Sequence, residues 1–67
     1  MIIDFDDYDG YNIASIIADK LPNLMDYITI KAKYKQISGK VIHIEKEYDT
    51  IRNCVRAFVR IDYKIPK

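Results

Sequence analysis

Residues 54–65 read C-V-R-A-F-V-R-I-D-Y-K-I and set an apolar side chain at every second position. Strict two-residue alternation puts successive side chains on opposite faces of a β-strand, whereas a helix would scatter them around its circumference. The stretch therefore predicts a long, half-buried antiparallel strand. Its inward face would carry Val55, Ala57, Val59, Ile61, Tyr63 and Ile65. Its outward face would carry Arg56, Phe58, Arg60, Asp62 and Lys64.

Two further segments, 28–36 and 41–48, alternate in the same way and predict the strands that accompany it. Between them, the sequence I-S-G-K predicts a turn at Ser38 and Gly39. The three segments together predict an antiparallel meander with the second strand in the centre. In that second strand we expect an inward face of Ile42, Ile44 and Tyr48, and an outward face of Val41, His43, Glu45 and Glu47.

Charge pairing predicts the register of the meander, because opposite charges directly across two strands stabilise the pair. A three-residue loop with Gly39 in the left-handed conformation would instead shift the first hairpin by two residues, and this alternative stays open. The pairs favoured by charge and by face are Lys33–Glu45, Lys31–Glu47, Glu47–Arg56, Tyr48–Val55, Ile44–Val59 and Ile42–Ile61.

The N-terminal half has a different period. Apolar residues recur at i, i+3, i+4 and i+8, namely Ile13, Ile16, Ile17 and Leu21. This spacing predicts an amphipathic helix over about residues 11–21, which ends before Pro22 because proline removes a backbone donor. Asp7 or Asp9 in the preceding turn would accept hydrogen bonds from the first N–H groups of that helix.

Residues 1–5 alternate loosely and predict a short N-terminal strand. The expected fold is therefore a single small α+β domain over residues 1–67. It consists of that strand, one amphipathic helix (about 11–21) and a three-stranded antiparallel β-meander (about 28–36, 41–48 and 54–65), on which the helix packs.

The chain is electrically polarised. Residues 1–27 hold six aspartates and one lysine, whereas residues 28–67 hold ten Lys or Arg and four Asp or Glu. Such asymmetry indicates an anionic partner for the basic half, or pairing of the two halves within or between copies of the chain. A chain of 67 residues buries little core, so a homodimer is as compatible with the sequence as a monomer.

Cys54 is the only cysteine, which excludes an intrachain disulfide and fits a reducing, cytoplasmic setting. Apolar runs are too short for a membrane span, and the first residues lack the pattern of a secretion signal. Abundant Ile, Lys, Tyr, Asp and Asn are typical of an AT-rich coding sequence, which suits a phage, virus or mobile element.

The outward face of the predicted sheet gathers Lys31, Lys33, Lys35, Arg56, Phe58 and Arg60. An aromatic ring between two arginines can stack a nucleobase while the guanidinium groups bind phosphates. Two central glutamates, Glu45 and Glu47, would oppose that use. A protein partner or a second copy bound through Phe58, and an ordinary solvated face, are the alternatives. Tyr8 and Tyr11 are further candidates for a contact surface, since tyrosine gives large contact area at low entropic cost.

No residue pattern indicates catalysis, a cofactor or a metal. The D-F-D-D-Y-D-G segment resembles a calcium loop, but Phe5 and Ile16 stand where that loop needs its first and last carboxylates. No nucleophile has a general base beside it. The sequence therefore predicts a non-catalytic interaction protein, encoded by a virus, phage or mobile element, that binds and modulates or inhibits a host protein. Nucleic-acid binding through the basic outer face is the alternative function.

Overall fold

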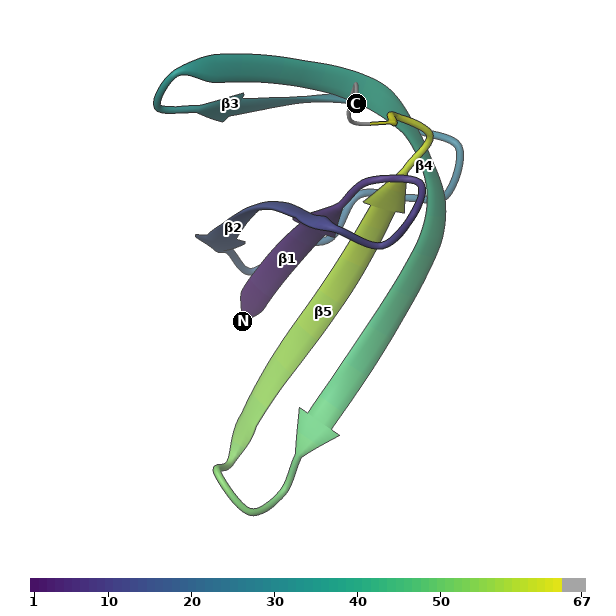
Figure 1. Ribbon diagram of the computed structural model, residues 1–67. Coiled ribbons are helices and arrows are strands. Elements are labelled where there is room, and N and C mark those ends of the chain that lie inside the picture. Colours follow the sequence, from purple (N-terminus) through teal and green to yellow (C-terminus); the bar gives the residue numbers. More distant parts are fainter. Residues whose placement is uncertain (65–67) are drawn as a thin grey trace.

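The computed structural model describes residues 1–64, which fold into five β-strands (Figure 1). These are β1 (Ile2–Asp6), β2 (Asn12–Ile17), β3 (Tyr27–Ala32), β4 (Lys35–Asp49) and β5 (Cys54–Ile61). They form a mixed sheet in the order β2-β1-β5-β4-β3, which curls into a nearly closed, barrel-like shape. About 62% of the described residues are in strands. Within the described residues there is no helix, and so none that could cross a membrane.

β4 joins the two halves of the sheet, because its two ends pair with different strands. Residues 35–40 pair antiparallel with β3, and residues 41–49 pair antiparallel with β5. β1 then pairs in parallel with β5 and antiparallel with β2. Figure 1 shows the long bend of β4, which carries β3 back over the other strands, while the β4–β5 hairpin extends away from them.

The core lies inside the curl and takes side chains from every strand. Val41, Val59 and Ile61 have no exposed surface, and Ile3 exposes 1%. The other buried apolar residues are Ile13, Ile30, Ile37 and Ala57. The strand and the alternation predicted for residues 54–61 are confirmed, because the buried residues of β5 alternate with side chains of higher exposure.

The predicted helix over residues 11–21 is wrong, and the fold is all-β instead of α+β. Residues 12–17 form β2, and the predicted N-terminal strand is confirmed as β1. The misleading spacing comes from a β-bulge, in which Ile13 is the extra residue between the pairs Phe5–Ala14 and Asp6–Asn12. An extra residue in one strand breaks the two-residue period. Ile13 and Ile16, three residues apart, thus both lie on the inner side of the sheet.

The aspartate predicted to cap the helix closes the β1–β2 loop instead. Asp7 is 1% exposed, and its Oδ1 accepts hydrogen bonds from the backbone N–H groups of Asp9 and Tyr11 at 3.0 and 2.8 Å. Gly10 has a φ of +91°, which a residue with a side chain adopts only under strain. The D-D-Y-D-G segment is therefore a turn, as predicted, but it leads into a strand.

The limits of the predicted meander strands are also corrected. The first hairpin turns at Lys33 and Tyr34, whereas Ser38 and Gly39 lie inside β4. The predicted strand over 54–65 ends at Ile61, and its last predicted residue lies outside the described residues. Both registers considered for the first hairpin are wrong. The observed pairs include Lys31–Gln36 and Thr29–Ser38.

Gly39 allows a close contact rather than a turn. A Cβ at this position would lie 2.8 Å from Oδ1 of Asp62 and 3.3 Å from the Cβ of Ile61. The same Asp62 oxygen accepts the backbone N–H of Lys40 at 2.7 Å. The missing side chain thus lets the bent strand β4 approach the end of β5.

The register predicted between β4 and β5 is confirmed up to the bend. The observed pairs include Glu47–Arg56, Tyr48–Val55 and Ile44–Val59. Beyond them, a second bulge makes Ile42 the extra residue, so Val41 rather than Ile42 pairs with Ile61. Val41, which was predicted to face outward, is consequently buried in the core.

Candidate functional site

Three of the predicted binding residues lie together on the outward face of β5. Arg56 is exposed, and Phe58 and Arg60 are half-buried. The guanidinium carbon of Arg56 lies 5.9 Å from the centroid of the Phe58 ring. This row is the part of the predicted surface that the structure reproduces.

Carboxylates flank the row on both sides. The cross-strand neighbours of Arg56, Phe58 and Arg60 include Asp4 and Asp6 from β1, and Glu45 and Glu47 from β4. Four carboxylates thus surround two guanidinium groups, which makes the face around Phe58 acidic overall. Shallow hollows of about 300 and 350 Å³ lie on either side of Phe58, and Asp6 lines both of them.

Asp4 holds three strands together from the outside. Arg56 donates its Nε–H to Oδ2 of Asp4 at 2.6 Å, and the Ser15 hydroxyl donates to Oδ1. The side chain of Asp4 is 7% exposed and that of Arg56 is 46% exposed. The hydrogen bond from Arg56 lowers the pKa of Asp4, and this outweighs the raising effect of burial. The partnership occupies Arg56, which the sequence suggested as a free phosphate ligand.

The three lysines predicted for the same face lie elsewhere. Lys31 is in β3, Lys33 is in the turn and Lys35 begins β4. β3 pairs with residues 35–40 of β4, not with the segment that carries the glutamates. The structure therefore divides the predicted basic surface into two parts. One is the row of Arg56, Phe58 and Arg60, the arginine row, which carboxylates flank. The other is a separate group of Lys31, Lys33 and Lys35 around the β3–β4 turn, the lysine turn.

Tyr8 and Tyr11 project from the β1–β2 loop. Tyr8 is 49% exposed and Tyr11 is 68% exposed. The ammonium group of Lys64 lies 4.6 Å from the centroid of the Tyr8 ring, and Tyr8 donates its N–H to the carbonyl of Tyr63 at 2.7 Å. Tyr8 thus anchors the segment after β5, and neither tyrosine adjoins the arginine row in the ladder of paired residues.

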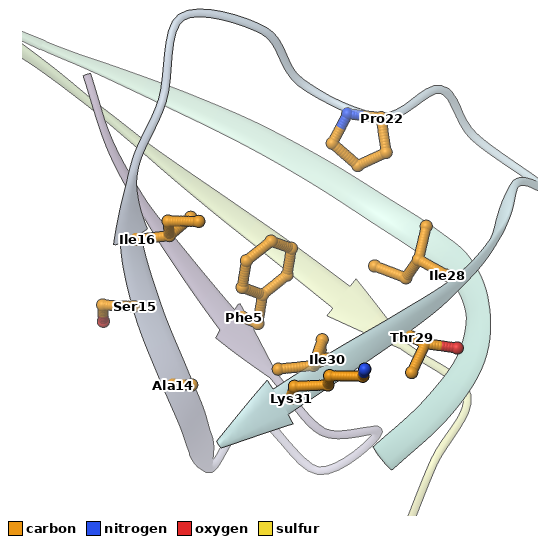
Figure 2. A pocket seen from close by; sticks show the side chains of 9 residues that line it. All are labelled: Phe5, Ala14, Ser15, Ile16, Pro22, Ile28, Thr29, Ile30 and Lys31. Atoms are coloured by element: carbon orange, nitrogen blue, oxygen red, sulfur yellow. The ribbon is translucent and has the colours of Figure 1, made fainter. Parts of the chain in front are cut away.

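A groove of about 340 Å³ lies between β2 and β3, the two strands that end the sheet order (Figure 2). Figure 2 shows Phe5 between Ile16 and Ile28, with Pro22 on the connection between β2 and β3. The full lining is Phe5, Ala14, Ser15, Ile16, Pro22, Ile28, Thr29, Ile30 and Lys31. The groove is therefore mainly apolar and is bordered by two strands, each of which has a neighbouring strand on one side only.

Alternate residues of β3 direct their backbone polar groups to the free edge. Ala32 and Lys35 flank a two-residue turn and therefore form a hydrogen-bonded pair. Since pairs alternate along an antiparallel ladder, Thr29 and Lys31 belong to non-hydrogen-bonded pairs. The hydroxyls of Thr29 and Ser38 lie 2.9 Å apart, as expected where paired side chains approach closely. The N–H and C=O groups of Thr29 and Lys31 therefore point away from β4.

The same reasoning applies to β2. Met1 and Ala18 exchange two hydrogen bonds of 3.0 Å, one in each direction, just beyond the Ile2–Ile17 pair. Met1 and Ala18 are therefore a hydrogen-bonded pair. Because hydrogen-bonded and non-hydrogen-bonded pairs alternate, the backbone N–H and C=O groups of Ser15 and Ile17 point to the free edge of β2. The groove thus has unpaired backbone donors and acceptors along two sides.

None of the groove residues except Lys31 was predicted as a binding residue. The predicted helix would have covered this side of the sheet, and a strand in its place leaves the space open. The signal was present in the isoleucines of N-I-A-S-I-I, since β-branched residues favour strands. The helical spacing concealed it.

Among residues 1–64, no three His, Cys, Asp or Glu side chains lie close enough together to hold a metal ion. Nothing in the structure supports a phage origin or an inhibitor role. Comparison of the chain with protein-family models, with curated proteins and with solved structures finds no match.

Proposed function

We propose that the protein is a binding module that takes up an extended segment of a partner protein along the free edge of β3. The observation that carries the proposal is the groove itself, in which an apolar lining lies next to unpaired backbone groups. A strand added to an exposed sheet edge gains main-chain hydrogen bonds, and its alternate side chains enter pockets. Four consecutive residues of β3, from Ile28 to Lys31, line the groove and supply both features.

The extent of the exposed surface supports this proposal. A compact monomer of 7.9 kDa exposes about 4,400 Å², whereas this chain exposes 5214 Å². The large exposed apolar residues include Ile16 at 52% and Ile17 at 81%, both in β2. Exposed apolar surface beside a groove is typical of an interaction site.

The nucleic-acid alternative receives less support from the geometry. The carboxylates beside Phe58 would repel a phosphate backbone, and Arg56 is already bonded to Asp4. The lysine turn lies apart from the only aromatic ring of the outward β5 row. Binding of an extended peptide needs neither a basic face nor an accessible Phe58.

Substitution of Thr29 by proline tests the proposal with little change to the fold. Proline lacks an N–H, and the N–H of Thr29 points to the free edge, so the ladder with β4 keeps its bonds. Thr29→Ala is the matched control, because it removes the same hydroxyl and keeps the N–H. Peptides selected from a random library against the wild-type protein are the probes.

We expect Thr29→Pro to bind the selected peptides at least about tenfold more weakly than Thr29→Ala, because only the proline variant loses a main-chain bond and disturbs its neighbours. Fluorescence anisotropy of labelled peptides measures the affinities, and urea unfolding verifies that both variants fold. Equal binding by the two variants, or no selected peptide at all, would refute strand addition at β3.

A further inference from the structure

We infer that the segment bound in the groove is acidic at the end that lies beside the β3–β4 turn. This inference rests on the proposed function and specifies the chemistry of its ligand. Lys31 is the only charged residue among the nine that line the groove. Lys33 and Lys35 follow it directly in the turn and at the start of β4, so positive charge accumulates at this end.

The three lysines have no carboxylate partner among residues 1–64. The ion pairs found there are Arg56–Asp4 and Arg52–Asp49. Lys31 lies across from the neutral Gln36, and the ammonium group of Lys33 lies 5.3 Å from the centroid of the Tyr34 ring. All three residues are exposed. A lysine turn without acidic neighbours therefore attracts acidic side chains of a ligand.

The rest of the groove specifies the apolar part of the ligand. Side chains at every second position of a bound strand point to the same face. In the groove that face meets Phe5, Ile16, Ile28 and Ile30, which have no polar side-chain atoms. The expected ligand is thus an extended peptide with apolar residues at alternate positions, followed or preceded by two or more Asp or Glu residues.

Electrostatic attraction between exposed groups predicts a specific dependence on salt. Each exposed ion pair contributes little, but three lysines together are expected to give about tenfold in affinity at low salt. Screening by salt shortens the range of the attraction to about 3 Å at 1 M. The advantage of an acidic peptide over a neutral one should therefore shrink as salt increases, while binding of the neutral peptide stays nearly constant.

The test uses the peptides recovered in the selection and copies in which every Asp and Glu is replaced by Asn and Gln. We expect the selected peptides to carry acidic residues at one end and to bind about tenfold more tightly than their neutral copies at low salt. The triple variant Lys31→Gln/Lys33→Gln/Lys35→Gln should bind both forms equally. The control Lys46→Gln/Arg52→Gln/Lys64→Gln loses the same charge elsewhere and should still distinguish them.

Two outcomes separate this inference from the function on which it rests. Peptides that need the Thr29 N–H but bind equally well in neutral form would refute the acidic ligand and leave strand addition intact. The absence of any peptide sensitive to Thr29→Pro would refute both. If the triple lysine variant and its control lose the same affinity, the attraction arises from overall charge and not from the lysine turn, which also overturns the inference.

Discussion

Ile61 and Ile17 are both isoleucines in strands of the same sheet, but Ile61 has no exposed surface and Ile17 exposes 81% of its own. β5, which holds Ile61, has a strand on each side and the core beneath it. β2, which holds Ile17, has a strand on one side only and borders the groove. The contrast shows that β5 is covered on every side, whereas the edge strand β2 leaves apolar surface and backbone groups uncovered, which the proposed binding would use.

Truncation of Ile61 should have the greatest effect on stability. Ile61→Ala removes buried methyl groups and leaves a cavity, at a cost of about 2–5 kcal/mol in the free energy of unfolding. Ile61→Val, at about 0.5–1.5 kcal/mol, gives a measurable value if the alanine variant does not fold. Urea unfolding followed by circular dichroism measures both. A cost below about 0.5 kcal/mol for both variants would mean that β5 is not the core strand.

Adding a methyl group at Gly39 should have the next effect. Its Cβ would meet Oδ1 of Asp62 at 2.8 Å and the side chain of Ile61, so β4 must move away from β5. Overpacking of this kind costs about 1–3 kcal/mol. The same urea titration measures Gly39→Ala. A neutral or stabilising result would contradict the close contact that bends β4 over the core.

Asp4→Asn tests how much the ion pair on the outer face of the inner strands contributes to stability. The loss of the ionic partner of Arg56 should cost about 1 kcal/mol at neutral pH, a modest value because Arg56 is half-exposed. Arg56 lowers the pKa of Asp4 in the folded protein, so the stabilisation is complete above the unfolded pKa of about 3.9 and disappears as pH falls through the folded value.

Unfolding measurements from pH 7 down to acid pH check this dependence. The wild-type protein should lose its advantage over Asp4→Asn below about pH 4. A difference between the two proteins that stays constant down to pH 2 would show that the ion pair is not its source.

Ile17→Ala should have the least effect on stability. An exposed side chain on an edge strand buries little area, so the free energy of unfolding should change by less than about 0.5 kcal/mol. A cost comparable to that of Ile61→Ala would show that β2 is covered in solution, for instance by a second copy of the chain. Sedimentation of the wild-type protein would then reveal the dimer.

The sequence alone predicts the strands correctly where apolar residues recur at every second position without interruption. The alternation of residues 54–61 predicted β5, and the charges of Glu47 and Arg56 predicted its register with β4. Both bulges broke that period. Ile13 made a strand resemble a helix, and Ile42 moved Val41 from the expected outer face to the core. A bulge is a tertiary adjustment of two paired strands, so one strand alone does not reveal it.

The first hairpin was misread for a different reason. Among residues 1–64 the residues with positive φ are Met25, Asn53 and Gly10, so the turn at Lys33 and Tyr34 needs no glycine and leaves no turn signal in the sequence. Gly39, the apparent turn residue, is required by contact with the end of β5 instead. The groove was missed because of the predicted helix, since the groove exists only when residues 12–17 form an edge strand.

Hydrogen exchange of individual backbone amides, measured by NMR on the free protein, tests the two free edges most directly. The amides of Ala14, Ile16, Ile28 and Ile30 point into the ladders and should be protected. Those of Ser15, Ile17, Thr29 and Lys31 point to the free edges of β2 and β3 and should exchange at nearly unprotected rates. Uniform protection along residues 12–17 and 27–32, as a helix or a closed sheet would give, would contradict the open edges on which the proposed binding depends.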